Sequence, residues 1–141
     1  MGYYMSQQSS AFQITKENLA GALAAIKALA NTPERMGGGS STGEKWYSWV
    51  DTKKFVNAET LADALGEWRW NCYIREDTGD LVEITFDGEK LGDDEILLSA
   101  IAPFVEAGSY IEMEGEEGHH WKWCFDGKTM TEKTGRVVYE D

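Results

Sequence analysis

The segment at residues 109–132 constrains the fold most strongly, because two turn signals divide it into three short stretches. Glu116-Glu117-Gly118 fits a three-residue hairpin loop with its glycine in the left-handed conformation, and Asp126-Gly127 is a strong signal for a two-residue hairpin. The first loop sets a register with apolar pairs on one face and charged pairs on the other: Met113 with Trp121, Ile111 with Trp123, Glu114 with His120 and Glu112 with Lys122. The sequence therefore predicts three antiparallel strands with one buried face.

The rest of the chain has the patterns of three helices and several more strands. Thr15 caps the first predicted helix, which extends to Asn31; Asn57 caps the second; the third begins at residues 93–95 and ends near Gly108. Strand-like stretches occur at residues 3–14, 46–51, 70–76, 80–86 and 135–139. The predicted hairpin around residues 77–79 pairs Ile74 with Val82, Cys72 with Ile84 and Trp70 with Phe86.

This order of elements predicts the fold class. A chain of 141 residues is the size of one ordinary domain, and we expect residues 1–141 to form a single α+β domain. Its mainly antiparallel sheet would carry the three helices on one face. Residues 46–114 alone follow the order of a ferredoxin-like unit, which the C-terminal strands would extend.

The glycine- and serine-rich segment at residues 36–45 invites a phosphate-loop interpretation, which its details oppose. A phosphate loop needs lysine directly after its last glycine, whereas Gly43 is followed by Glu44 and only then by Lys45. The segment also leads from a predicted helix into a predicted strand, the reverse of a phosphate loop. The composition instead predicts a flexible loop.

The negative charge is concentrated in one part of the chain. The formal net charge is -12, and residues 76–117 hold fourteen acidic residues against one base, Lys90. Such a surface repels nucleic acid and anionic membranes and attracts a basic protein surface. The alternative is that these carboxylates only keep the domain soluble. The predicted partner-binding residues are Glu112, Glu114, Glu116, Glu117, Asp77, Asp80, Glu83, Asp87, Asp93 and Asp94.

Other chemistry has weaker signals. His119 and His120 are neighbours on a predicted strand and so point to opposite faces. A small-ligand or metal-binding module on the tryptophan and histidine strands is the alternative function, with Glu114 opposite His120 as its polar pair. Trp121 and Trp123 could form a recognition surface, but aromatic residues on one strand face more often belong to the core. A third alternative is a hydrolase whose carboxylates assemble only in three dimensions.

The sequence has no signal for catalysis, for a cofactor or for a membrane span. No pattern indicates a catalytic nucleophile, an EF-hand or a cofactor, so we expect neither an enzyme nor a bound cofactor. The longest apolar run, residues 97–105, is too short to span a membrane. Cys72 and Cys124 are expected to be free thiols, and we expect a cytoplasmic location. The sequence does not indicate an oligomeric state.

Part of the chain resembles a known group of proteins. The stretches at residues 91–95, 102–105, 108–113 and 121–123 together resemble a segment of small, acidic, largely uncharacterised proteins of bacteria and their phages, over about a third of the chain. The group supplies no catalytic residues to carry over. The resemblance implies a protein that binds host machinery, such as a counter-defence inhibitor of nucleic-acid-guided immune complexes. We therefore expect a non-enzymatic phage or mobile-element inhibitor, anti-CRISPR-like or a nucleic-acid mimic.

Overall fold

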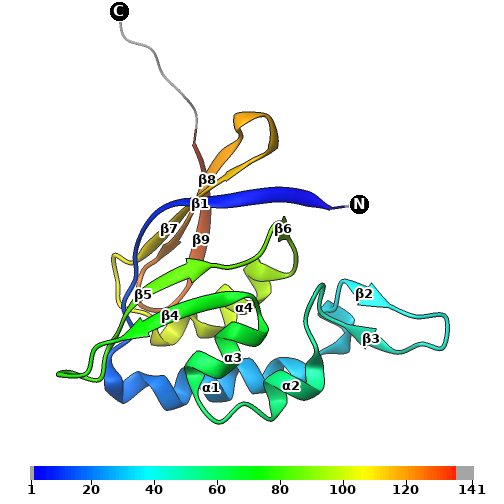
Figure 1. Cartoon of the computed structure of the whole chain (residues 1–141), viewed down its shortest axis with the longest axis horizontal. Coiled ribbons are helices and arrows are strands. Elements are labelled where there is room, and N and C mark those ends of the chain that lie inside the picture. The colour runs from blue at the N-terminus through cyan, green and yellow to red at the C-terminus, as the bar shows by residue number, and fades with distance from the viewer. Residues whose placement is uncertain (1, 136–141) are drawn as a thin grey trace, which may run out of the picture.

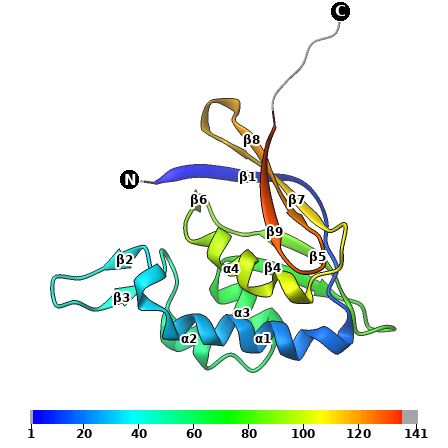
Figure 2. The same cartoon turned by 180° about the vertical axis from the view of Figure 1, so that it is seen from behind.

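An antiparallel sheet covers one side of the protein in the computed structural model, which describes residues 2–135. The five strands lie in the order β6-β1-β7-β8-β9, with these bounds: β1 Tyr3–Ala11, β6 Lys90–Leu91, β7 Tyr110–Gly115, β8 His120–Phe125 and β9 Met130–Gly135. Figures 1 and 2 show that this sheet curls above the helices. The predicted α+β class with a mainly antiparallel sheet is confirmed.

The helices form the opposite layer, and their number differs from the prediction. The α-helices are α1 Leu19–Ala28, α2 Thr52–Val56, α3 Leu61–Glu67 and α4 Asp94–Ile101. Short 3-10 turns extend α1 at both ends and α4 at its end, where Pro103 follows Ala102. Asn57 does not cap a helix start but ends α2, because Asp51 and Thr60 provide the caps of α2 and α3. Three capping-type residues within ten positions made this boundary ambiguous.

The register predicted for β7 and β8 is confirmed at all four pairs, Ile111 with Trp123, Glu112 with Lys122, Met113 with Trp121 and Glu114 with His120. Glu117 and Gly118 both have positive φ in the connecting loop, 60° and 74°. The next loop is longer than predicted, because Phe125 pairs with Met130. The Asp126 carboxylate accepts hydrogen bonds from the main-chain nitrogens of Lys128 and Thr129 at 2.8 and 2.7 Å, and so holds a four-residue connection.

A second, two-stranded sheet consists of β4 Trp70–Ile74 and β5 Leu81–Phe86. The predicted pairs Trp70 with Phe86 and Cys72 with Ile84 are confirmed, but a bulge shifts Ile74 to pair with Leu81. This sheet lies beside β1: the side-chain amide of Gln7 donates to the main-chain oxygen of Ile84 in β5 at 3.0 Å, and Ile14, just after β1, forms a bridge with Leu81. β1 is therefore the junction of the two sheets.

The segment at residues 46–51 is not a strand beyond Trp46. The nitrogen of Val50 donates to the oxygen of Tyr47 in a turn, and Trp49 has a φ of 61°. Tyr47 is buried and its hydroxyl donates to the Leu29 oxygen at 2.8 Å. Because Tyr47 and Val50 are both buried three positions apart, the chain must turn between them.

The glycine-rich segment predicted as a flexible loop contains a short ribbon, formed by β2 Gly38–Gly39 and β3 Lys45–Trp46. It projects away from the helices and sheets (Figure 1). The ferredoxin-like core is not confirmed, because β3, the β4–β5 pair and β7 belong to three different sheets. Of the strand predicted at residues 135–139, only Gly135 lies within the described residues, where it ends β9.

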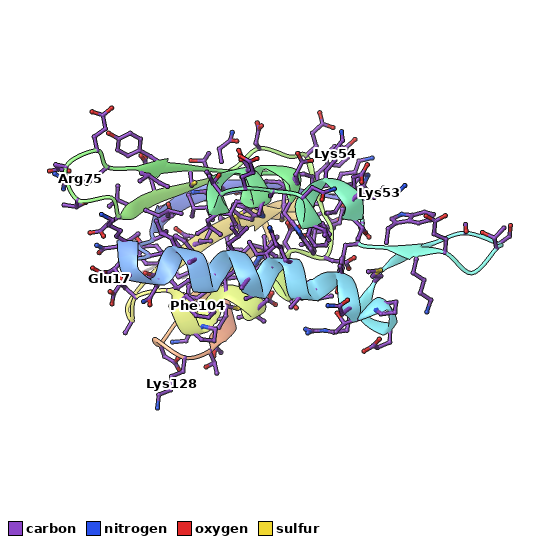
Figure 3. All side chains as sticks on the ribbon, turned by 90° about the horizontal axis from the view of Figure 1, so that it is seen from below. Glu17, Lys53, Lys54, Arg75, Phe104 and Lys128 are labelled. Atoms are coloured by element: carbon purple, nitrogen blue, oxygen red, sulfur yellow. The ribbon has the colours of Figure 1, made fainter. Side chains whose placement is uncertain are left out.

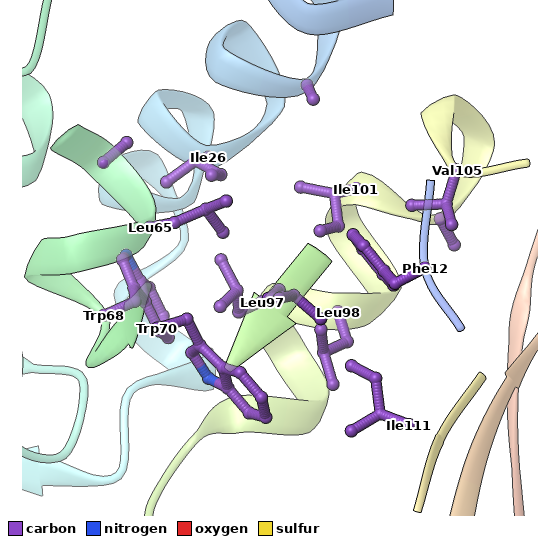
Figure 4. Packing of buried hydrophobic residues seen from close by; sticks show 14 of the residues in the cluster. Phe12, Ile26, Leu65, Trp68, Trp70, Leu97, Leu98, Ile101, Val105 and Ile111 are labelled. Carbon is purple, nitrogen blue, oxygen red and sulfur yellow. The ribbon is translucent and has the colours of Figure 1, made fainter. Parts of the chain in front are cut away.

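The core lies between the two layers, with α4 at its centre. Leu97, Leu98 and Ile101 of α4 are fully buried. Figure 4 shows them between Ile26 and Leu65 on the helical side and Ile111 on the sheet side. Burial of each such side chain stabilises the fold by roughly 1.5–3 kcal/mol. No described helix has the length and apolarity needed to cross a membrane.

Candidate functional site

The predicted acidic residues are distributed over several parts of the molecule. At the tip of the β4–β5 hairpin, Asp77 forms an ion pair with Arg75 at 2.7 Å, and the Asp80 carboxylate accepts from the main-chain nitrogen of Lys16 at 2.8 Å. Figure 3 shows Arg75 at the opposite end of the molecule from Lys53 and Lys54 of α2. The two carboxylates at this tip therefore already have local partners.

Asp94 cannot contact a partner, because it is fully buried. Its carboxylate accepts from the indole Nε1 of Trp70 at 3.0 Å, from the nitrogen of Gly92 at 2.9 Å and from Arg69 at 3.0 Å. Burial raises the pKa of Asp94, and the charge of Arg69 and the hydrogen bonds from Gly92 and Trp70 lower it in part. The predicted surface role of Asp94 is wrong, and its role is structural.

Asp93 also holds the structure together. One carboxylate oxygen, Oδ2, accepts from the nitrogen of Gly37 at 3.0 Å and from the nitrogen of Ser48 at 2.8 Å. These bonds attach the base of the β2–β3 ribbon and the turn after it to the start of α4. Asp93 therefore positions a loop, and its side chain does not cap its own helix by a hydrogen bond.

The outer face of the five-stranded sheet has mixed charge. Glu112 accepts from the Ser9 hydroxyl at 2.7 Å and lies opposite Lys122, while Glu114 lies 3.4 Å from Nε2 of His120. Lys122 in turn lies opposite Lys133 of β9. The carboxylates on this face are thus largely compensated near the middle of the sheet. Glu83 of β5 and Asp87, which follows β5, are exposed and belong to the two-stranded sheet, not to this face.

Three acidic residues lie around one hollow at the end of the sheet where β1 begins and β7 ends. Glu89, Glu114 and Glu116 line a hollow of about 430 Å³ together with Tyr4, Met5, Ser6, Gly88 and Gly115. We call this the acidic hollow. Its lining residues include no base, and the nearest bases border it: Nε2 of His120 lies 3.4 Å from Glu114, and Nζ of Lys90 lies 5.0 Å from the centre of the Tyr4 ring. Tyr4 is 52% exposed, and its main-chain nitrogen donates to Oε1 of Glu116 at 3.4 Å.

Sequence reasoning found two of these three carboxylates and missed one. Glu114 and Glu116 were predicted, whereas Glu89 was counted only as part of the acidic segment. Glu89 lies near the other two because β1 is paired with a strand on each side. On one side, Tyr4 pairs with Lys90 of β6, which follows Glu89; on the other side, Ser6 pairs with Glu114 of β7. Glu117 is exposed in the adjoining β7–β8 loop.

The histidine and tryptophan strands do not present an aromatic surface. Trp121 and Trp123 are buried, at 4% and 0% exposed, and Nε1 of Trp123 donates to Glu132 at 3.1 Å. Within residues 2–135, no group of three or more histidine, cysteine, aspartate or glutamate side chains is placed to hold a metal ion. Cys72 and Cys124 are free thiols, and burial raises the pKa of Cys72.

Comparison with known proteins assigns no function to the site. No protein family, curated protein or solved structure matches the chain. The resemblance to small acidic proteins of bacteria and phages stays an expectation from the sequence.

Proposed function

We propose that this chain is a non-enzymatic protein that binds a basic surface of another protein through the acidic hollow. The observation that carries the proposal is that Glu89 lines the same hollow as Glu114 and Glu116, which come from a distant part of the chain, and that no lysine or arginine lines it. Carboxylates in a concave surface focus the electric field and raise the rate of association with a positively charged partner. The excess of acidic residues in residues 76–117 acts in the same direction.

The partner that fits this chemistry is a nucleic-acid-binding protein of a host cell. Such proteins carry basic grooves that accept phosphates, and fixed carboxylates can occupy the same groove. The resemblance of part of the sequence to phage and bacterial proteins supports an inhibitory role, with the chain acting as a mimic of nucleic acid. Binding is then salt-dependent, because exposed charge pairs are screened.

Charge reversal tests the proposal. Tagged protein is used to capture partners from a bacterial lysate at low and high salt, with identification by mass spectrometry. The test variant carries Glu89→Lys, Glu114→Lys and Glu116→Lys. The matched control carries Glu17→Lys, Glu34→Lys and Glu59→Lys, which are exposed elsewhere and change the net charge equally.

The proposal expects the wild type and the control to retain a basic partner at low salt, and the hollow variant to lose it. Equal loss in both variants would assign the binding to net charge and not to the hollow. Equal retention by all three proteins would contradict the proposal.

A further inference from the structure

Two large residues with a left-handed backbone meet beside the acidic hollow. Trp49 has a φ of 61° and Arg69 a φ of 71°. The central carbon of the Arg69 guanidinium lies 5.1 Å from the centre of the Trp49 ring and 5.2 Å from that of the Phe86 ring. Residues other than glycine adopt positive φ at a cost in free energy, and such strain is concentrated at functional sites.

A rigid set of contacts holds Arg69 in place beneath Trp49. Its guanidinium donates to the main-chain oxygen of Lys90 at 2.6 Å and to the buried Asp94 at 3.0 Å. The glycine at position 92 leaves the space for this arrangement, because a Cβ there would lie 2.8 Å from a guanidinium nitrogen and 3.1 Å from the Trp49 ring. Trp49 therefore rests on a fixed support.

Trp49 nevertheless remains at the surface. It is 52% exposed and lines a hollow of about 220 Å³ with Arg69, Glu89 and Lys90. Glu89 lines this hollow and the acidic hollow alike, so the two adjoin. Tyr4 lines the acidic hollow together with Glu89 and is as exposed as Trp49. Nζ of Lys90 lies 5.0 Å from the centre of the Tyr4 ring. Two exposed aromatic residues thus flank the carboxylates.

We propose that Trp49 and Tyr4 contact arginine side chains of the partner, so that the partner segment recognised here is arginine-rich. This inference rests on the proposed function and names the side chains that the site selects. Each ring already lies beside a cation of the chain itself, and the exposed part of each remains free for another. A guanidinium stacks on aromatic faces and pairs with carboxylates through two parallel hydrogen bonds, whereas an ammonium does neither as well.

The charge of the surface and the residue types agree with this occupant. Trp, Tyr and Arg are the residues that most often dominate binding free energy at protein interfaces. Glu89, Glu114 and Glu116 outnumber the two bases at this surface, Lys90 and Arg69, and Arg69 is already paired with the buried Asp94. The surface therefore keeps a net negative charge, which is complementary to a segment with repeated positive charge.

The test compares two synthetic ten-residue peptides, one of alternating arginine and serine and one of alternating lysine and serine. Fluorescently labelled peptides are titrated with the full chain, and affinity is read from anisotropy. Trp49→Asn removes the indole and supplies a residue that tolerates positive φ, so that loss of fold does not explain a loss of binding. Tyr73→Ala is the matched control, because Tyr73 is 54% exposed on β4 and lines neither hollow.

We expect the wild type to bind the arginine peptide more tightly than the lysine peptide. Trp49→Asn should weaken arginine-peptide binding by roughly five-fold and reduce the preference over lysine, and Tyr4→Ser should act in the same direction. Tyr73→Ala should change neither. If Trp49→Asn and Tyr4→Ser bind as the wild type does while the triple charge reversal abolishes binding, the aromatic role is wrong and the proposed function stands. If the wild type binds neither peptide, or binds both equally, the arginine-rich occupant is overturned, and the capture experiment decides on the proposed function separately.

Discussion

The side-chain carbonyl of Gln7 accepts a hydrogen bond from the main-chain N–H of Phe86 at 2.8 Å. The same amide donates to the main-chain oxygen of Ile84 at 3.0 Å, so one side chain pairs with β5 as a strand would. The register of β1 with β7 shifts between Gln7 and Ser9, next to this contact. Gln7 thus joins the two sheets at an irregular point of β1.

Gln7→Leu should destabilise the fold by about 2 kcal/mol, because it leaves the N–H of Phe86 and the oxygen of Ile84 without partners in a partly buried position. The measurement is the free energy of unfolding in urea. Gln8→Leu is the control, because Gln8 is exposed and its side-chain amide donates to the exposed hydroxyl of Ser6. Equal stabilities of the two variants would show that the Gln7 contacts contribute little.

Asp94→Asn should lower the free energy of unfolding by about 3 kcal/mol, because it leaves the Arg69 guanidinium without its anion at a site where Arg69 is only 15% exposed. Asp87→Asn, at an exposed position, should have almost no effect. Thermal and urea unfolding of both variants provide the comparison. If Asp94→Asn is as stable as the wild type, the hydrogen bonds from Trp70 and Gly92 are sufficient to stabilise this site without the negative charge.

Stability should decrease as the pH rises from about 5 to 8 because of a carboxyl pair between α4 and β9. The main cause is the hydrogen bond that protonated Glu95 donates to the Glu132 carboxylate, which raises the pKa of Glu95 to about 7; burial and the Glu132 charge add to it. A raised pKa in the folded state means that the folded protein holds a proton that the unfolded chain has released. The stabilisation is thus complete below the unfolded pKa and is lost as the pH passes through 7.

The effect should be about 1 kcal/mol or less, because both carboxyls are exposed enough for water to screen them. Glu132→Gln keeps the shape and can still accept from Nε1 of Trp123. Unfolding free energies of the wild type and this variant, measured at pH 5, 6.5 and 8, give the contribution of the pair. Parallel pH curves for the two proteins would rule out a shared proton.

Two glycine substitutions should change stability in opposite directions. Gly118 has a φ of 74° and Gly66 lies inside α3, and neither would place a new Cβ within 4 Å of another atom. Gly118→Ala should therefore destabilise by about 1 kcal/mol through backbone strain alone. Gly66→Ala should stabilise by about 0.5–1 kcal/mol through helix propensity. Shifts of the same sign would contradict the left-handed assignment of the loop.

The sequence was sufficient to predict those parts of the fold that depend on turn residues and on the alternation of apolar side chains along neighbouring strands. The register of β7 and β8 followed from Gly118 and from a strict alternation of apolar side chains, so the sequence was sufficient there. The strand predicted at residues 46–51 was wrong, because their aromatic residues have the pattern of a strand, whereas Tyr47 is buried against the 3-10 turn that follows α1, and its burial requires a turn.

The candidate site was predictable only in part for the same reason. The burial of Asp94 depends on Trp70 and Arg69, which are more than twenty positions away in the sequence. The position of Glu89 beside Glu114 depends on β1 pairing with two strands at once. Charge composition identified the acidic half of the chain, and only the topology selects which carboxylates meet.

Among the described residues, β9 lies at one edge of the five-stranded sheet, and its sequence opposes growth of the sheet into a fibril. Facing residues of antiparallel strands point to the same side, so two copies of β9 that continue one sheet must match inner with inner positions and outer with outer. Two of these pairings overlap most. In one, Glu132 faces Glu132 of the second copy, and in the other, Lys133 faces Lys133, so each places like charges in direct contact. The outermost strand therefore carries a built-in barrier to edge-to-edge aggregation.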